Sequence, residues 1–269
     1  MKFLNTLILI LIRLFLFSQT TFKQINSGNY IIGSETNLYN NKRITWIDSF
    51  SISIYEITNL EFKKFIEETG YITTAEINHD AMVFRWGLKD FIWFNDTTAN
   101  WRFPNGISFG SIDSLMNHPV TTISYLDAQE YCKWSKTRLP TLIEWEIASK
   151  GNIDSKYFFG RNPQLLDQFA NIWIGKSHFA NSYNDRYVFT SPVGSFKPNP
   201  NGLYDIYGNV FEFCSGYITN YDTIDDHIIH TRGGSWWCSE NTCRAFNSWD
   251  IGNLNAYASF SNVGFRVCK

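Results

Sequence analysis

The sequence predicts an α+β domain in which short helices and strands are joined by many turns. Three segments carry a capping box followed by a helical run of apolar residues. The other segments break into short apolar pieces between Gly, Asn, Asp and Pro, with neither a 3.6-residue nor a 2-residue period. Aromatic residues make up 17% of the chain, and such large side chains can hold short, irregular elements together by packing.

Each predicted helix begins at Ser or Thr with an acidic residue three positions later. The three capping boxes are Thr58-x-x-Glu61, Ser124-x-x-Asp127 and Thr141-x-x-Glu144. Gly70 and Gly151 stand where the first and third helices should end, because glycine readily adopts the left-handed conformation of a C-terminal cap.

Two strands are expected in the N-terminal third. Tyr30–Ile32 is a short apolar run that stops at Gly33, and Ser51–Glu56 alternates polar and apolar residues. No repeat, low-complexity tract or linker divides the sequence. We therefore expect one domain, from residue 24 to residue 269.

Residues 1–20 have the layout of a signal peptide. Lys2 precedes an apolar run from Phe3 to Phe17, and polar residues follow it. Arg13 disfavours a permanent membrane span, because arginine at the centre of a span costs about 2.5–3.5 kcal/mol. We expect an exported protein, periplasmic or secreted, that contacts a membrane only if this segment remains as an uncleaved anchor.

Composition and charge exclude other classes. The chain is 44% hydrophobic and 18% charged, which excludes a disordered protein. It has 23 basic and 25 acidic residues, a net charge of −2, and no long basic run. Nucleic acid is therefore not an expected partner.

Cys238 and Cys243 lie five positions apart in the C-terminal region. On a regular helix or strand their side chains would point in different directions, so they converge only if the chain turns between them. Residues 239–241 are Ser, Glu and Asn, which suit a turn. A converging pair can form a disulfide, bind a soft metal ion such as Cu(I), or fill space, and the spacing alone leaves these alternatives open.

Histidines offer two further alternatives. His227 and His230 lie shortly before the cysteine pair, and the four side chains could form a closed zinc site, although the spacing is looser than in zinc-finger motifs. A non-haem iron oxidase is the weaker option, because the 5 histidines are scattered without the spacing of a facial triad.

Motifs along almost the whole chain resemble one known family. The most specific is Arg232-Gly233-Gly234-Ser235-Trp236-x-Cys238-x4-Cys243 with Asn262-Val263-Gly264-Phe265-Arg266 after it. Further blocks follow in family order: Tyr55–Asn59, Gly70–Glu76, Asn100–Arg102, His118–Val120, Arg138–Thr141, Glu144–Glu146, Ala170–Trp173 and Gly202–Glu212. With these motifs the chain resembles the formylglycine-generating enzymes, or sulfatase-modifying factors. The resemblance implies their compact fold, which has little regular secondary structure and is distantly similar to C-type lectins.

The resemblance also implies a reaction. A copper(I) ion on Cys238 and Cys243, with Ser235 lining an oxygen pocket, would use O2 to oxidise a cysteine in an unfolded sulfatase or another polypeptide to Cα-formylglycine. The sulfatase motif is Cys-x-Pro-x-Arg. The blocks shared across the superfamily identify the fold and not the activity. A non-catalytic protein-interaction module, in which the two cysteines are bridged, is therefore the alternative.

Two structural calcium sites are implied in the same way. Their ligands would be Asn171, Ile172, Asp185 and Tyr187 in the first site, and Asp205, Gly208, Val210 and Glu212 in the second. Carboxylates interleaved with backbone carbonyls suit calcium. In the alternative interpretation, Asp205 and Glu212 accept backbone N–H bonds in tight turns.

The implied substrate groove departs from the family. Asp80, Trp93, Ser259 and Asn262 match peptide-binding residues. The departures are Ile251 for an arginine, Thr242 for a tyrosine, Ala81 for a serine and Ile92 for one of two tryptophans. The loss of an arginine removes a contact worth about 1.5–3 kcal/mol. We expect altered substrate recognition around an intact metal site.

Three cysteines remain. Cys132 matches a half-cystine of the family, but Cys268 lies one residue beyond its usual partner position. Because a shift of one residue turns a strand side chain to the opposite face, this bridge is not secure. Cys214 is expected to be a buried structural residue.

Overall fold

A computed structural model of the 269-residue chain describes residues 20–37, 39–89, 92–160, 162, 165–175, 177–182, 186–216, 227–243 and 245–269. The predicted signal peptide falls on residues 1–19 and Thr20, so almost all of it lies outside the described residues. Among the described residues, no helix combines the length and hydropathy that crossing a membrane requires.

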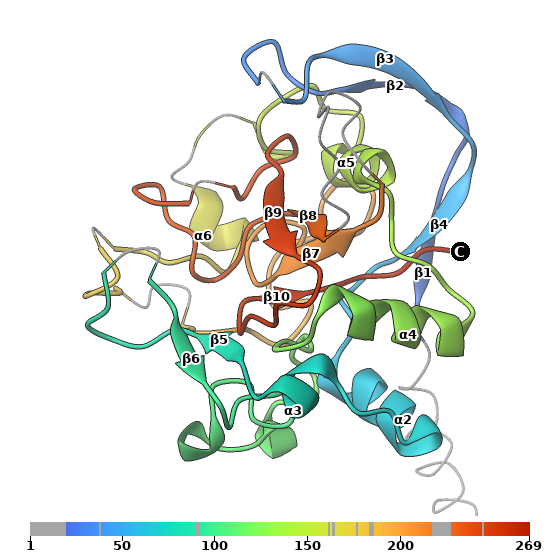
Figure 1. Cartoon of the computed structure of the whole chain (residues 1–269). Helices are drawn as coiled ribbons and strands as arrows, with labels where there is room; N and C mark the ends of the chain where they lie inside the picture. Colours follow the sequence, from blue (N-terminus) through green and yellow to red (C-terminus); the bar gives the residue numbers. More distant parts are fainter. Residues whose placement is uncertain are drawn as a thin grey trace, which may run out of the picture.

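The strands form one four-stranded sheet and three two-stranded ones. The bounds are β1 Phe22–Ile25, β2 Gly28–Ile32, β3 Arg43–Ile47, β4 Phe50–Ser53, β5 Ala81–Val83, β6 Phe94–Asp96, β7 Phe211–Cys214, β8 Ile228–Arg232, β9 Gly252–Asn255 and β10 Val263–Gly264. The large sheet has the order β10-β7-β8-β9 and lies at the centre of the molecule (Figure 1). Within it, β10 runs parallel to β7 and the other neighbours are antiparallel.

The helices are α2 Asn59–Thr69, α3 Thr74–Asn78, α4 Tyr125–Ser135, α5 Leu142–Lys150 and α6 Leu166–Phe169, with 3-10 turns at Ile107–Phe109 and Ile112–Ser114. The three predicted helices are confirmed as α2, α4 and α5, each with the complete capping box. Gly70 and Gly151 are left-handed caps, as predicted. Each capping box contributes about 1 kcal/mol and fixes where the helix begins.

Two local predictions need correction. The strand expected to reach Glu56 ends at Ser53, because the Arg266 guanidinium takes the carbonyl oxygens of Ser53 and Ile54 at 3.1 and 3.4 Å. The short helix α3 was not predicted as a helix. Its capping box, Thr73 with Glu76, is the same signal that located the other three.

The central sheet separates two hydrophobic clusters. On one side α2 and α4 pack with Trp101, and on the other α5 packs with the 203–207 loop (Figure 1). Consecutive residues of β7 face opposite sides, so Phe213 belongs to the α2–α4 cluster and Cys214 to the α5 cluster. Aromatic side chains pack edge to face in these clusters, as Phe62 and Trp101 do at 5.5 Å.

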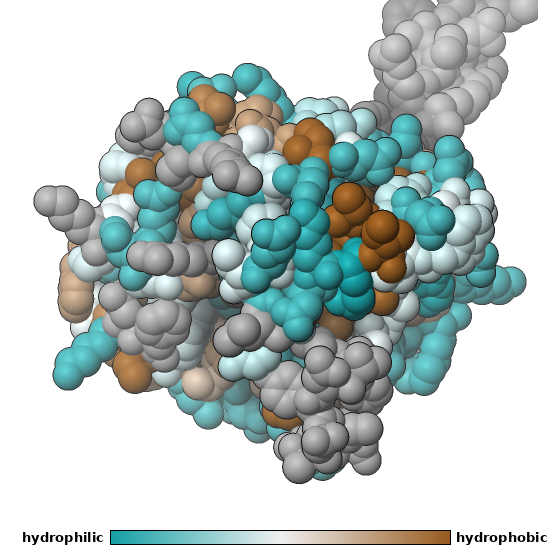
Figure 2. Space-filling view, turned by 90° about the horizontal axis from the view of Figure 1, so that it is seen from above, coloured by the Kyte–Doolittle hydropathy of each residue, from teal (hydrophilic) through white to brown (hydrophobic). Residues whose placement is uncertain are grey.

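The β2–β3 hairpin lies at one end of the molecule. Ile31 pairs with Ile44, and both side chains, together with that of Trp46, are exposed. Seen from this end, the surface carries hydrophobic side chains in small groups among hydrophilic ones (Figure 2).

A buried ion pair joins the segments around the sheet. Arg266 and Glu212 have 0% and 1% of their side chains exposed, with Nε to Oε2 at 2.6 Å and Nη2 to Oε1 at 2.7 Å. Trp145 of α5 also donates to Glu212, at 2.6 Å, and Arg266 donates to the carbonyl oxygen of Tyr204, at 2.9 Å. Removing one partner would leave an uncompensated charge in the interior.

We predict that Arg266→Met lowers the free energy of unfolding by about 3–5 kcal/mol, because Glu212 then loses its buried counter-ion. Urea denaturation measures the loss. Lys133→Met is the matched control, since Lys133 pairs with Glu130 at the surface with 71% of its side chain exposed, and such a pair is worth under about 1 kcal/mol. Equal losses in the two variants would contradict the role given to the buried pair.

Candidate active site

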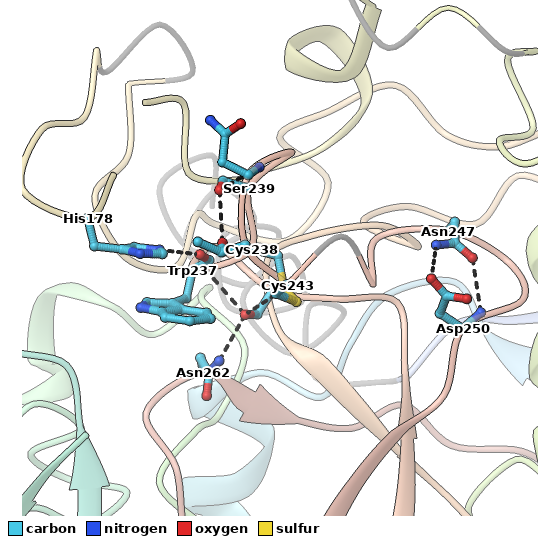
Figure 3. The surroundings of a disulfide bond; sticks show 11 residues. His178, Trp237, Cys238, Ser239, Cys243, Asn247, Asp250 and Asn262 are labelled. Atoms are coloured by element: carbon cyan, nitrogen blue, oxygen red, sulfur yellow. Dashed lines mark hydrogen bonds between the residues drawn. A yellow bond between two sulfur atoms is a disulfide. The ribbon is translucent and has the colours of Figure 1, made fainter. Parts of the chain in front are cut away.

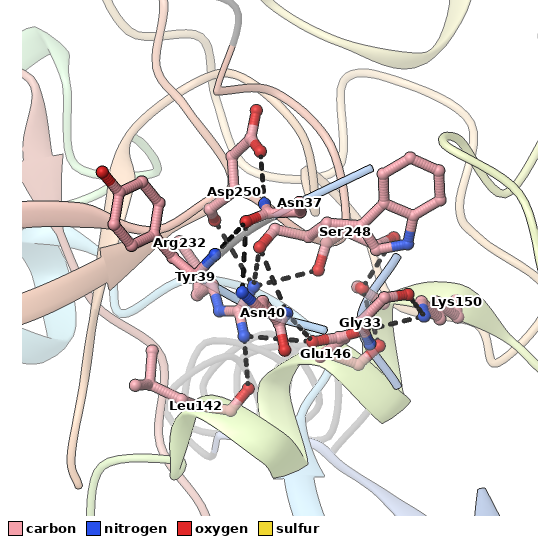
Figure 4. A network of polar contacts seen from close by, with 12 residues as sticks. Gly33, Asn37, Tyr39, Asn40, Leu142, Glu146, Lys150, Arg232, Ser248 and Asp250 are labelled. Carbon is pink, nitrogen blue, oxygen red and sulfur yellow. Dashed lines mark hydrogen bonds and ion pairs between the residues drawn. The ribbon is translucent and has the colours of Figure 1, made fainter. Parts of the chain in front are cut away.

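The cysteine pair lies on the segment that leaves β8, and Arg232 fixes the end of that strand. Its buried guanidinium donates to the carbonyl oxygens of Ser248 and Trp249, at 3.1 and 2.8 Å. It also pairs with Glu146 of α5 at 3.1 Å, and Lys150 lies 2.8 Å from the other oxygen of that carboxylate (Figure 4). The strand end is therefore held to α5 and to the 248–250 loop.

Two glycines let the chain turn directly after Arg232. Gly233 and Gly234 have φ of 88° and 74°, a region that residues with a Cβ rarely adopt. A Cβ on Gly234 would lie 2.7 Å from the backbone nitrogen of Phe246. The Gly-Gly of the motif is thus required by the close approach of the two segments.

The predicted turn between the cysteines is present, and Cys238 and Cys243 form a disulfide with Cα atoms 4.8 Å apart (Figure 3). The Thr242 N–H donates to the carbonyl of Ser239 at 3.2 Å, and the two hydroxyls are 2.8 Å apart. Cys238 is completely buried, whereas Cys243 is partly exposed. Only the second sulfur can readily meet another molecule.

Ser235 lies beside Cys238 and is bonded to Asn262. The Ser235 hydroxyl is 3.9 Å from the Cys238 sulfur and accepts a hydrogen bond from Asn262 Nδ2 at 2.9 Å. It also accepts the backbone N–H of Trp237 at 3.3 Å. The hydroxyl is therefore held in place next to the sulfur.

The other predicted groove residues come from β5, the segment before β6 and the 259–262 segment. The Met82 N–H donates to the Ser259 carbonyl at 2.8 Å and the Met82 carbonyl accepts the Ser261 N–H at 3.0 Å, which joins β5 to the 259–262 segment. Asp80 Oδ1 and Ser259 Oγ are buried without a hydrogen-bond partner. Trp93 packs on Trp237 with ring centroids 5.6 Å apart.

An aromatic cluster connects Trp93 with the cysteines. Phe84, Trp173, Trp236 and Trp237 are buried in it, and Trp93 and Cys243 pack against it while partly exposed. Cys243, the more exposed of the two cysteines, therefore packs against an aromatic cluster.

The four positions expected to depart from the family have different environments. Ala81 is buried in β5, Ile92 is 53% exposed, and Thr242 lies in the turn before Cys243. Ile251 and Cys243 are partly buried against the same hydrophobic cluster. At Ile251 and Thr242, aliphatic and hydroxyl groups stand where the resemblance implies an arginine and a tyrosine.

At the first predicted calcium site, Asn171 binds protein groups. Its Nδ2 donates to the Phe189 carbonyl and to Asn209 Oδ1, at 2.8 and 3.1 Å, and its own carbonyl accepts the Asn209 N–H at 2.8 Å. Ile172 is buried, and the Tyr187 ring packs on Phe196. Asp185, the predicted carboxylate ligand, lies outside the described residues.

At the second site, carboxylates outnumber cations. Glu212 is paired with Arg266, and the buried Asp205 and Glu56 lie within electrostatic range of both. Asp205 Oδ2 accepts the Gly194 N–H at 2.6 Å, but Asp205 Oδ1 and Glu56 Oε1 have no hydrogen-bond partner. Burial, which the Gly194 bond and the nearby guanidinium only partly offset, raises the pKa of Asp205 to about 7. An excess negative charge therefore arises only at a pH above the raised pKa values of Asp205 and Glu56.

Of the other ligands at that site, Gly208 and Val210 lie in the turn between Asp205 and β7. The Gly208 N–H donates to the Gly233 carbonyl at 2.9 Å, which joins this turn to the cysteine-bearing segment. Val210 is fully buried.

Sequence reasoning missed two residues of these regions. Glu56 ends the alternating Ser51–Glu56 segment, and an acidic residue in that register is the signal that could have identified it. His178 Nε2 lies 2.7 Å from the carbonyl oxygen of Trp237, next to Cys238. A single histidine in a turn-rich segment offers no sequence signal for this role.

The histidines of the zinc alternative have other contacts. His230 Nδ1 bonds Asn253 Oδ1 at 2.7 Å, and the His227 ring packs on Tyr257. Across the residues with described positions, no group of three or more His, Cys, Asp or Glu side chains could hold a metal ion. The closed Cys-His zinc site therefore finds no support there.

The remaining three cysteines are buried free thiols. Cys132 faces the α2–α4 cluster together with Val267, while Cys268 faces the α5 cluster. The one-residue shift has thus turned Cys268 away from Cys132, and no bridge forms between them. Burial raises the pKa of Cys132 to about 12 and raises the pKa of Cys214 and Cys268 well above the usual range.

Comparisons with known proteins agree with the predicted fold. Residues 17–269 match the family model described as the sulfatase-modifying factor enzyme 1-like domain. The chain is 34% identical over 250 residues to the formylglycine-generating enzyme of Mus musculus, covering 84% of this chain and 67% of that protein. It is 32% identical over 240 residues to a Bos taurus protein named inactive C-alpha-formylglycine-generating enzyme 2, covering 83% and 78%. The structure of PvdO from Pseudomonas aeruginosa superposes with a TM-score of 0.66 at 19% identity, over 92% of this chain and 93% of that one, which shows a shared fold.

We predict that, after mild reduction, an alkylating reagent modifies Cys243 first and Cys238 at least about tenfold more slowly, because burial restricts access to a thiolate. Cys132, Cys214 and Cys268 should remain unmodified from pH 7 to pH 9, since their raised pKa values keep them as thiols in the folded protein. Peptide mass spectrometry at timed intervals measures each rate. Modification of Cys238 before Cys243 would contradict the assigned difference in access.

Proposed function

The chain belongs to the sulfatase-modifying factor enzyme 1-like family, and on that premise we propose that it oxidises a cysteine in a polypeptide to Cα-formylglycine. The observation that carries the proposal is the Cys238–Cys243 pair, with Cys238 buried beside Ser235 and the partly exposed Cys243 packed against an aromatic cluster. The relative from Mus musculus is named for the formation of formylglycine.

Copper(I) is the proposed cofactor. The two sulfurs lie within bonding distance as a disulfide, so after reduction both thiolates can reach one soft ion. Copper(I) tolerates low coordination numbers, which leaves a position for the substrate thiolate. Bound there, the ion would supply the activation of O2 that oxidation at the substrate Cβ requires.

The protein side chains would bind and orient the peptide. Trp93, which is partly exposed and packs on Trp237, offers an apolar ring to the peptide. Asp80 and Ser259 are the proposed polar contacts, and their buried, unpartnered oxygens would have to become accessible when the peptide binds. Asn262 keeps the Ser235 hydroxyl against Cys238, where it can donate to oxygen. An unfolded sulfatase segment of the Cys-x-Pro-x-Arg type is the proposed partner, and an exported protein the proposed setting, because disulfides persist there.

Calcium is proposed as a structural ion at the second site. The unpartnered oxygens of Asp205 and Glu56 are hard ligands, and the excess negative charge around Arg266 favours a divalent cation. Glu212 already accepts bonds from Arg266 and Trp145, so its side chain acts mainly as their acceptor.

The second candidate function is a non-catalytic interaction module of the same fold. Two points favour it: the cysteine pair is bridged, and Ile251 stands where the resemblance implies an arginine. The relative from Bos taurus named inactive shows that the family includes proteins without the activity. The two functions differ in whether the reduced pair binds copper.

We predict that the reduced protein without residues 1–20 binds one Cu(I) and converts a Cys-x-Pro-x-Arg peptide to the aldehyde. Cys238→Ala and Cys243→Ala should each lower turnover by at least about 100-fold, because a lost ligand costs more than the 10–100-fold typical of a residue behind the ligands. Cys214→Ala is the matched control, since that buried thiol lies outside the pair. Copper titration and peptide mass spectrometry provide the measurements.

The outcomes separate the two functions. Copper binding without conversion of the peptide would support an oxidase with another substrate, consistent with Ile251 and Thr242. Copper binding that does not require Cys238 and Cys243 would exclude the catalytic proposal and leave the interaction module.

A second prediction concerns calcium removal. A chelator should lower the melting temperature of the unmodified protein and leave that of Asp205→Asn unchanged. In the chelated state at pH 8, above the raised pKa of Asp205 of about 7, Asp205→Asn should be more stable than the unmodified protein by about 1–3 kcal/mol, because it removes an uncompensated buried charge. Asp127→Asn is the control, since Asp127 is buried but fully hydrogen-bonded in a capping box. An equal chelator effect in both variants would place the calcium elsewhere.

A further inference from the structure

Two hydrogen bonds from one segment hold the backbone of Trp237 and Cys238. The Trp173 N–H donates to the Cys238 carbonyl at 2.9 Å, and His178 Nε2 lies 2.7 Å from the Trp237 carbonyl. Figure 3 shows the His178 ring pointing at this carbonyl, beside the disulfide. Two successive carbonyl groups are thus held from the same side.

The orientation of His178 is determined by stacking as well as by the hydrogen bond. The side chain is 1% exposed, and its ring lies parallel to the Trp237 ring, with centroids 4.1 Å apart and an interplanar angle of 4°. The centroid of the Trp173 ring lies 4.8 Å from the centroid of the His178 ring, with the two planes tilted by 48°. Because a carbonyl oxygen only accepts, Nε2 must carry the hydrogen.

The second cysteine, Cys243, lies in a different environment from Cys238. Cys243 is partly exposed and follows the Ser239–Thr242 turn, in which the Ser239 and Thr242 hydroxyls are 2.8 Å apart and Asn241 Nδ2 donates to the Gly175 carbonyl at 3.3 Å. When the disulfide opens, the bonds from Trp173 and His178 still act directly on the carbonyl groups of Cys238 and Trp237.

We propose that His178 is a positioning residue for Cys238, one that keeps this thiol in the orientation needed to meet Cys243 or a shared metal ion when the disulfide is open. The inference rests on the proposed function in one respect, which is that the pair works as a dithiol. In the oxidised protein the disulfide itself restrains Cys238. The hydrogen bond from His178 therefore restricts the orientation of Cys238 mainly in the reduced protein. When Cys238 keeps one orientation, its thiol has a higher effective concentration relative to the thiol of Cys243. This favours both the disulfide and the metal complex.

The test is the redox equilibrium with glutathione, in which two glutathione thiols reduce the Cys238–Cys243 disulfide and leave as glutathione disulfide. His178→Phe keeps a stacking ring and removes the hydrogen bond. It should make the disulfide on the order of tenfold easier to reduce, which is about 30 mV less negative for a two-electron couple. Copper(I) affinity should fall by a similar factor. His178→Gln should restore both values, because its amide can donate to the same carbonyl.

A matched control separates positioning from general packing. His230 is also buried and hydrogen-bonded, to Asn253 in the neighbouring strand, so His230→Phe should change thermal stability without changing the redox equilibrium. If His178→Phe does not fold, His178→Met provides the same loss of the bond in a flexible side chain. If His178→Phe shifts the redox equilibrium with glutathione no more than His230→Phe does, the proposal is overturned.

These measurements do not depend on turnover. A shift in the redox equilibrium with no aldehyde formed from any peptide would support the role of His178 and count against the proposed oxidation. Aldehyde formation with no shift in the redox equilibrium of His178→Phe would support the proposed oxidation and count against the role of His178.

Discussion

The buried pair of Arg266 and Glu212 is the interaction on which the arrangement of the other segments depends. Arg266 comes from the C-terminal segment and Glu212 from β7, and together they bind the exit of β4, the Tyr204 loop and Trp145 of α5. Each segment contributes a carbonyl or an indole N–H that would otherwise be buried without a partner. Because a charge in the interior is costly without its counter-ion, the chain gains this connection only when all of these segments are assembled.

The same region contains more buried carboxyl groups than cations. Arg266 neutralises Glu212, but Glu56 and Asp205 lie in the same buried space and mutual repulsion and burial raise the pKa of Glu56. One guanidinium cannot compensate three carboxylates. Backbone carbonyls of a turn-rich chain can complete the coordination of calcium, which takes more ligands than these side chains provide. The proposal of calcium at this place therefore depends on charge and not on a recognisable cluster of side-chain ligands among the described residues.

Sequence reasoning succeeded where the signal was local. The capping boxes fixed α2, α4 and α5, since both hydrogen bonds of each box join residues three apart. The turn between Cys238 and Cys243 was likewise local. The early end of β4, the role of Glu56 and the position of His178 could not be read in this way. Each depends on a partner far along the chain: Arg266, Asp205 and Trp237, respectively. In a fold with little regular structure, such distant contacts decide most of the geometry.

Chemistry and recognition are built on different parts of this fold. The cysteine-bearing segment is anchored in the interior by Arg232 and by the tight contact of Gly234 with Phe246, so few substitutions there would leave it in place. Thr242, Ile92 and Ile251 lie outside this anchor, each exposed or partly exposed. These positions can change without loosening the anchor, because none of them supplies a bond to Arg232 or a contact to Gly234. A chain of this family can therefore keep its thiol pair in place while the polypeptide it accepts changes, and the departures at Thr242 and Ile251 have this physical character.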